Sequence, residues 1–235
     1  MTEASPFNEE LEKLRERLPV VKGNADQYEF EHFIAPRLAA CGWEARFRTH
    51  HTLARGQKLV TRDALALLRN KGAVLGLVGE RGLGKTTIAS HIALERAEHF
   101  WAFYSTMPDD REGLAPPQGI PVYRKMAALV TKFKPLYADF GSVDTESLLE
   151  AKERLCNETL LVIDELHECE ELKAKDRILT DIVDIRYSRR RDTILISNQT
   201  EQEFRASTNF SVVSRLMEHG RIFVCKWPSF REVTK

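Results

Sequence analysis

The chain has 235 residues, of which 43% are hydrophobic, and its 35 lysines and arginines balance 35 aspartates and glutamates. This length and apolar content suit one α/β domain of ordinary size with a short appendage, and they exclude extensive disorder. A formal net charge of +0 excludes a strong positive field, so any nucleic-acid binding must depend on a local patch.

Residues 1–50 carry mainly helical patterns. Apolar side chains recur at helical spacing from Phe7 to Leu18 on an otherwise charged segment. A second helical segment is predicted for residues 26–41, bent or broken near Pro36 and ended by Gly42. So small a segment has little core of its own, and it must pack on the main domain or on another protein. We therefore divide the chain into an N-terminal helical, partner-binding segment (1–50) and a main domain (51–235).

From about residue 59 the pattern changes to helices that alternate with short apolar strands. Strands are predicted at residues 73–78, 120–123, 159–163, 193–197 and 222–225. Helices are predicted at residues 61–70, 85–99, 145–156 and 172–189, and residues 107–119, rich in proline and glycine, are predicted to form an exposed loop. This alternation predicts an α/β fold with a five-stranded parallel sheet sandwiched by helices.

The strongest motif is G-E-R-G-L-G-K-T, which follows the first predicted strand and opens a helix. Its glycines let successive backbone N–H groups point at phosphate oxygens, and the helix adds its positive N-terminal end. A chance glycine-rich turn is the alternative, but the complete motif between a strand and a helix favours a nucleotide site. The cofactors predicted are ATP and Mg²⁺, with Lys85 on the β- and γ-phosphates and the Thr86 hydroxyl on the metal. The nucleotide contacts are assigned to the loop and the residue after it: Gly79, Glu80, Arg81, Gly82, Leu83, Gly84, Lys85, Thr86 and Thr87.

A carboxylate pair, Asp164 and Glu165, follows the apolar run Leu160–Ile163. Ligands of open α/β sheets gather at the carboxyl ends of strands. Asp164 would act on Mg²⁺, and Glu165 would polarise the water that attacks the γ-phosphate. A solvated turn or a helix cap is the alternative, but the position after a phosphate-binding loop favours ATP hydrolysis.

Two further polar residues follow the carboxylate pair along the chain, in the order expected for an ATPase of this kind. Asn198 ends the strand 193–197 and could hydrogen-bond the γ-phosphate or orient the water, although Ser-Asn after a strand is by itself a turn signal. Arg215 lies on a predicted helix and could reach the γ-phosphate of a neighbouring subunit. Most surface arginines have no such role, so residue type alone leaves this open.

Taken in this order, the motifs resemble the DnaC/IstB branch of AAA+ ATPases, which includes bacterial and phage replicative helicase loaders and the ATPase subunits of certain transposons. The resemblance covers roughly residues 41–231. Its more discriminating parts are R-Y-S-R-R-R-D-T-I-L-I-S-N at 186–198 and the final K-W-P-S-F-R at 226–231. The short stretch after Cys225 leaves no room for the C-terminal lid domain of many AAA+ proteins, which also fits this branch. Two departures are Thr87, where histidine is frequent, and Asp-Glu in place of Asp-Asp.

The resemblance implies an AAA+ ATPase domain at residues 51–235. It implies catalytic roles for Lys85, Glu165, Asn198 and Arg215, the last as an arginine finger that acts in trans within a homo-oligomer. It implies that Thr86 and Asp164 bind the metal. Arg231 falls where loaders carry a late arginine that contacts nucleotide.

A local basic cluster is the candidate for DNA binding. Arginines with a neighbouring aromatic ring can bind phosphates and stack a base, although charge runs at helix ends are usually only solvated. The resemblance favours DNA, and the residues assigned are Arg186, Tyr187, Arg189, Arg190 and Arg191. Because the net charge is neutral, affinity for DNA should be modest unless subunits assemble.

These inferences predict an ATP-dependent loader of a hexameric, DnaB-type replicative DNA helicase, acting in DNA replication and binding single-stranded DNA. One alternative is a transposition ATPase subunit that binds duplex DNA and recruits a transposase, and another is an ATP-sensing adaptor with little hydrolysis. A cytoplasmic location without a membrane partner is predicted, because residues 1–10 are polar and no apolar stretch approaches the ~20 residues of a membrane span. Four cysteines without a C-x-x-C pair suit the same reduced compartment.

Overall fold

The computed structural model describes residues 30–68, 72–105, 119–137 and 144–229, and these contain one parallel sheet. The strands are β1 (Val74–Val78), β2 (Val122–Lys125), β3 (Leu160–Asp164), β4 (Asp192–Ser197) and β5 (Gly220–Val224). Their order is β2-β3-β4-β1-β5, and every pairing is parallel. The predicted α/β class, with five parallel strands sandwiched by helices, is confirmed.

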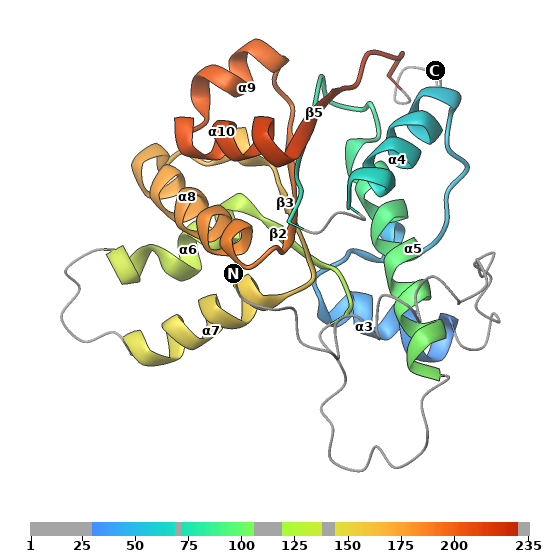
Figure 1. The fold of residues 1–235 in the computed structure, drawn as a ribbon, viewed down its shortest axis with the longest axis horizontal. Helices are drawn as coiled ribbons and strands as arrows, with labels where there is room; N and C mark the ends of the chain where they lie inside the picture. The colour runs from blue at the N-terminus through green and yellow to red at the C-terminus, as the bar shows by residue number, and fades with distance from the viewer. Residues whose placement is uncertain (1–29, 69–71, 106–118, 138–143, 230–235) are drawn as a thin grey trace, which may run out of the picture.

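Helices cover both faces of this sheet (Figure 1). One face carries α3 (Ala35–Ala40), α4 (Arg55–Leu68) and α5 (Lys85–Ser105). The other carries α6 (Met126–Phe133), α7 (Thr145–Asn157), α8 (Leu172–Ser188) and α10 (Phe210–His219), with the short α9 (Glu201–Ser207) beside α10. Strand alternation separates two apolar cores, because Leu75 and Leu77 point to the α4–α5 face while Val74 and Val78 point to the α6–α10 face.

Within the described residues, the predicted elements match the observed ones apart from their ends and two short helices; the predicted loop at residues 107–119 lies outside the described residues except for Gly119. Helix α4 begins at Arg55, before the predicted start at residue 61, and α5 extends beyond residue 99. Helices α6 and α9 were not predicted. For α9 a signal was present, because Thr200 and Glu203 form a capping box of the S/T-x-x-E type.

The entry segment joins the main core. Ile34, Leu38 and Trp43 are almost fully buried against the α5 face, and the indole Nε1–H of Trp43 donates to the Pro121 carbonyl at 2.8 Å. Pro36 lies in the first turn of α3, directly after the π-helical turn Phe30–Ile34, so the helical path changes near this proline. The predicted helix within residues 1–29 lies outside the described residues, and a partner-binding segment ending at residue 50 stays a prediction.

None of the helices in the described part of the chain has both the length and the apolar character needed to cross a membrane.

Candidate nucleotide and catalytic site

The glycine-rich loop turns sharply between the end of β1 at Val78 and the start of α5 at Lys85. Gly79, Gly82 and Gly84 have φ angles of 137°, 83° and 71°, a region that side chains disfavour. At Gly79 space is also missing, because a Cβ there would lie 2.7 Å from the Cys225 carbonyl oxygen. The glycines of the motif therefore meet a conformational need of this loop.

Lys85 lies inside the curl of the loop and is only 4% exposed. Its ammonium donates to the carbonyl oxygens of Gly79 at 2.7 Å and Glu80 at 2.6 Å. A positive charge therefore sits beside the N-terminal end of α5, where the helix dipole also attracts anions.

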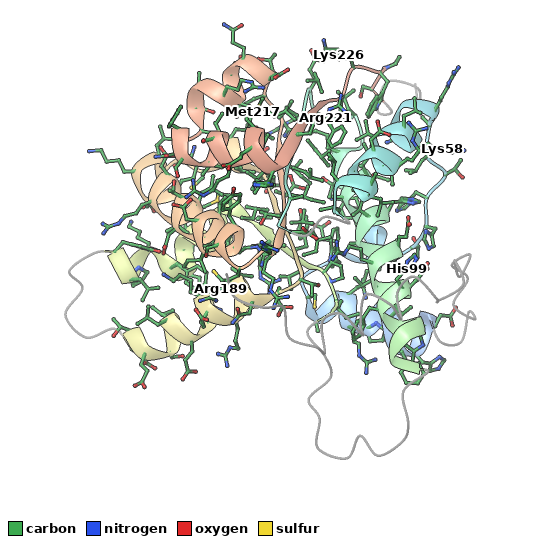
Figure 2. All side chains as sticks on the ribbon, viewed as in Figure 1. Lys58, His99, Arg189, Met217, Arg221 and Lys226 are labelled. Carbon is green, nitrogen blue, oxygen red and sulfur yellow. The ribbon has the colours of Figure 1, made fainter. Side chains whose placement is uncertain are left out.

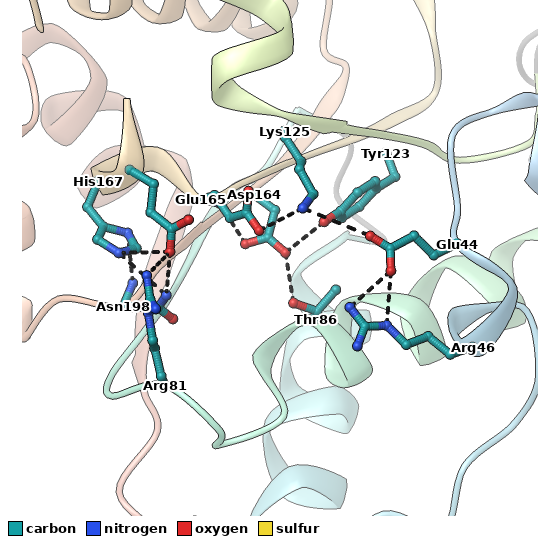
Figure 3. Close-up of polar contacts among 11 residues, drawn as sticks. Glu44, Arg46, Arg81, Thr86, Tyr123, Lys125, Asp164, Glu165, His167 and Asn198 are labelled. Carbon is teal, nitrogen blue, oxygen red and sulfur yellow. Dashed lines mark hydrogen bonds and ion pairs between the residues drawn. The ribbon is translucent and has the colours of Figure 1, made fainter. Parts of the chain in front are cut away.

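The second element of the site is a contact between Thr86 and Asp164 (Figure 3). The Thr86 hydroxyl donates to Asp164 Oδ2 at 2.7 Å, and the Tyr123 hydroxyl donates to the same oxygen at 3.0 Å. Burial raises the pKa of Asp164, and the hydrogen bonds from Thr86, Tyr123 and the Glu165 backbone act against this rise. A hydroxyl beside a carboxylate is an oxygen donor set that suits Mg²⁺, so the residues fit the predicted metal.

Glu165 follows Asp164 in a left-handed conformation, with φ 57°, and its carboxylate forms an ion pair with Lys125 at 2.9 Å. The lysine is placed there by strand register, since Lys125 at the end of β2 pairs with Asp164 at the end of β3. The hydrogen bond that Lys125 donates to Glu165 raises the pKa of the lysine. Glu44 lies 4.0 Å from the same ammonium. The candidate catalytic base is therefore held in a charge pair.

A second polar group lies on the other side of the loop (Figure 3). The Arg81 guanidinium pairs with Glu168, and the Asn198 side chain donates to that same carboxylate at 3.4 Å. His167 accepts a hydrogen bond from the Asn198 backbone at 3.4 Å, and burial lowers the pKa of its ring. Asn198 thus lies next to a residue of the phosphate loop, at the ends of neighbouring strands β3 and β4.

Four residues of this site were not predicted from the sequence: Tyr123, Lys125, His167 and Glu168. Lys125 ends β2 and Tyr123 lies two residues before it, while His167 and Glu168 lie in the short helical turn after β3. The rule that identified Asp164 could have pointed to the ends of these strands, but it does not give the contacts that the residues make there.

Arg215 lies on α10 and contacts α8 within its own chain. Its Nε pairs with Asp184 at 2.8 Å, its Nη1 donates to the Ser211 hydroxyl at 2.9 Å, and its guanidinium lies 5.2 Å from the Tyr187 ring centroid. A role in trans stays a prediction. Arg231 lies outside the described residues.

The predicted DNA-binding cluster is corrected at Arg186, which is fully buried. Its guanidinium donates to the carbonyls of Leu155, Glu158 and Asp192 and to the Thr193 hydroxyl. Burial lowers its pKa to about 10, so the group is still charged at neutral pH. Arg186 joins α8, β4 and the end of α7, and its assignment to DNA binding is wrong.

The remaining members of the cluster differ in exposure. Arg189, labelled in Figure 2 where α8 ends beside α7, is exposed and pairs with Glu153 at 2.6 Å. Arg190 is exposed and has a φ of 53° at the turn after α8. Tyr187, under Arg215, and Arg191 are both half-buried. The exposed charge of this segment is therefore carried by Arg189 and Arg190.

A parallel sheet in the order β2-β3-β4-β1-β5, with the phosphate loop after β1 and the carboxylate pair after β3, is the fold of AAA+ domains. Comparison with solved structures supports this assignment of the fold. The chain is similar to the crystal structure of the DnaC helicase loader, with a TM-score of 0.53 and 22% identity over 78% of this chain and 98% of that one.

It is also similar to a putative primosome component from Streptococcus pyogenes serotype M3, with a TM-score of 0.52 and 15% identity over 80% of this chain and 92% of that one. The replication initiator DnaA bound to AMPPCP and single-stranded DNA gives a TM-score of 0.54 and 15% identity, over 76% of this chain and 49% of that one. The match to a DNA replication initiation factor likewise spans 48% of that chain. No protein-family model and no curated protein matches the sequence. At these identities the likeness establishes the fold, and it agrees with the DnaC/IstB-like motifs.

Proposed function

We propose that this protein is an ATP-dependent loader of a replicative DNA helicase, acting in the cytoplasm during DNA replication. The observation that carries the proposal is the Thr86–Asp164 contact of 2.7 Å beside Lys85 and Glu165, within a fold that matches the DnaC helicase loader over 98% of its chain. The Thr86–Asp164 contact supports nucleotide chemistry, and the match to the helicase loader supports the biological role.

The residues have distinct tasks in ATP hydrolysis. The loop N–H groups and Lys85 bind the phosphates and neutralise their charge. Thr86 and Asp164 would hold Mg²⁺, which when bound supplies further positive charge to the phosphate oxygens. Glu165 orients the attacking water and accepts its proton, which requires the carboxylate to separate from Lys125. Asn198 lies on the opposite side of the loop, where it can orient the γ-phosphate or the water.

An assembly completes the site in this proposal. Arg215 would leave its contact with Asp184 and reach the γ-phosphate of a neighbouring subunit, where it would stabilise the transition-state charge. Such a switch would make hydrolysis depend on subunit contact. The protein would then be a homo-oligomer in its active form.

Two macromolecular partners follow. The N-terminal segment would bind the helicase, and the exposed Arg189 and Arg190 would contact the phosphates of single-stranded DNA. Two of the similar structures favour these partners, since one is a helicase loader and the other is a replication initiator bound to single-stranded DNA.

The test is a pull-down of the hexameric helicase by the full-length chain and by a chain that starts at Phe30. A cut at residue 30 is preferable to one at residue 50, because Ile34, Leu38 and Trp43 belong to the core. The proposal expects co-purification only with the full-length chain, and ATP turnover stimulated by single-stranded DNA. Absence of helicase binding, with turnover stimulated by duplex DNA alone, would instead indicate the transposition ATPase.

A further inference from the structure

The indole of Trp227, just after β5, reaches the phosphate loop from the far end of the sequence. Its Nε1–H donates to the Leu83 carbonyl oxygen at 2.8 Å. The amide of Gln57 in α4 donates to the same oxygen at 3.4 Å. Figure 2 shows the chain leaving β5 at Lys226 and turning toward α4. One carbonyl of the loop is therefore held by side chains from two distant elements.

This carbonyl has a particular place in the loop. Leu83 stands between Gly82 and Gly84, whose φ angles of 83° and 71° are left-handed conformations that favour glycine. The Leu83 C=O and the Gly84 N–H belong to one planar trans peptide, so they point in opposite directions. Because the indole and the Gln57 amide both bind the carbonyl, the Gly84 N–H points away from these two side chains and is left for a phosphate oxygen.

Gly56, the second residue of α4, adds independent evidence that the indole position is specified. A Cβ at Gly56 would lie 2.7 Å from Cε3 and 3.2 Å from Cζ3 of Trp227. The absence of a side chain at Gly56 therefore lets the indole ring pack directly against the first turn of α4.

We propose that Trp227 is a positioning residue for nucleotide binding, which orients the Leu83–Gly84 peptide so that the Gly84 N–H faces the phosphates. The inference rests on the proposed ATP-binding function of this loop and assigns a role to a residue outside the phosphate-binding motif. Trp227 acts through the loop and does not contact the reacting atoms. Trp227 should therefore stabilise ATP bound in the ground state and in the transition state by the same amount.

The test compares Trp227→Phe with wild type. Phenylalanine keeps an aromatic ring against Gly56 but removes the N–H donor. A net loss of one hydrogen bond predicts an about three- to tenfold weaker binding of a fluorescent ATP analogue and an equal rise in the KM for ATP. The kcat should stay within about twofold, because uniform binding does not change it. A rise in KM without a fall in kcat separates positioning from general damage to the fold.

Two variants give the controls. Gly56→Ala should weaken nucleotide binding to a similar extent by displacing the indole, although alanine favours the helix and should preserve the melting temperature. Trp101→Phe makes the same chemical change near the other end of α5, where Trp101 stacks on Phe33, and it should leave nucleotide affinity unchanged.

The outcomes separate the inference from the proposed function. If the wild-type chain binds no nucleotide, the proposed function fails and this inference fails with it. If wild type binds and both Trp227→Phe and Gly56→Ala bind equally well, the role of Trp227 is refuted while the proposed function stands. Equal weakening by Trp101→Phe, or a fall in kcat at constant KM, would also refute it.

Discussion

Replacing Arg186 by methionine tests the buried position of this arginine. Methionine keeps an unbranched apolar stem in the core, but four close acceptors lose their donor: the carbonyls of Leu155, Glu158 and Asp192 and the Thr193 hydroxyl. The Leu155 carbonyl lies in the last turn of α7, so it has no hydrogen-bond donor within its own helix.

The size of the effect follows from two opposing contributions. Each buried acceptor left unpaired costs about 1–3 kcal/mol. Removal of the guanidinium also removes its own cost of burial, which is several kcal/mol and is the cause of its lowered pKa. The balance predicts a net loss of about 3 kcal/mol of unfolding free energy, estimated from these hydrogen bonds. For a domain of this size that corresponds to a fall in melting temperature of about 6–12 °C.

Thermal unfolding followed by circular dichroism measures this loss, and filter binding measures DNA affinity at a temperature where both proteins are folded. Arg189→Met is the matched control, because it removes an exposed arginine nearby and should leave the melting temperature close to that of wild type. A variant Arg186→Met with normal stability and weakened DNA binding would refute the structural role.

Three further predictions follow from the contacts of the site and its surroundings. Lys125→Met should release Glu165 and raise ATP turnover in the absence of DNA. The rise should be at most about fivefold, because an ion pair of this exposure is worth up to about 1 kcal/mol. Unchanged turnover would contradict this prediction. Arg215→Ala should lower turnover about a thousandfold while nucleotide affinity is kept, and activity that persists at every protein concentration would exclude a finger acting in trans. His91 accepts a hydrogen bond from the His51 backbone at 2.9 Å, and burial lowers its pKa to about 4. The unfolded ring binds its proton near pH 6.5, so stability should fall as the pH drops from 6.5 to 4, and urea unfolding of His91→Gln should show a smaller fall than wild type. Equal pH dependence of the two proteins would show that His91 does not contribute.

The strands could be predicted because their sequences are locally unambiguous. Apolar runs such as Leu160–Ile163 have the composition of strands buried on both faces, and a carboxylate pair after such a run marks the edge where ligands bind. The order of the strands could not be predicted in this way, because it depends on how the crossover helices pack and not on any one strand.

The same limit explains why Lys125 was missed. Its contact with Glu165 exists because β2 and β3 are neighbours in register, which strand patterns do not specify. Trp227 and Leu83 are likewise brought together by the packing of the final segment on α4, far from the motif in sequence.

Arg186 shows a different kind of error, since a usable signal was present. Counted along α8, it follows Ile178, Ile182 and Val183 at helical spacing, and all three are fully buried. The residue type indicated an exposed charge, whereas the helical spacing from the buried apolar residues indicated a position in the core. The spacing was the better guide, because backbone carbonyls at the end of α7 and from β4 were available to pair with the guanidinium.

The central claim is that the loop after β1 and the carboxylates after β3 form an ATP-hydrolysing site. Steady-state phosphate release by Glu165→Gln and by wild type, with bound nucleotide measured in the same samples, tests it most directly. The structure places Glu165 next to Asp164 and in contact with Lys125, so glutamine should keep the site intact but remove the base. The account predicts unchanged ATP binding and a loss of turnover of about a hundredfold or more. Turnover equal to that of wild type, with ATP bound, would contradict it.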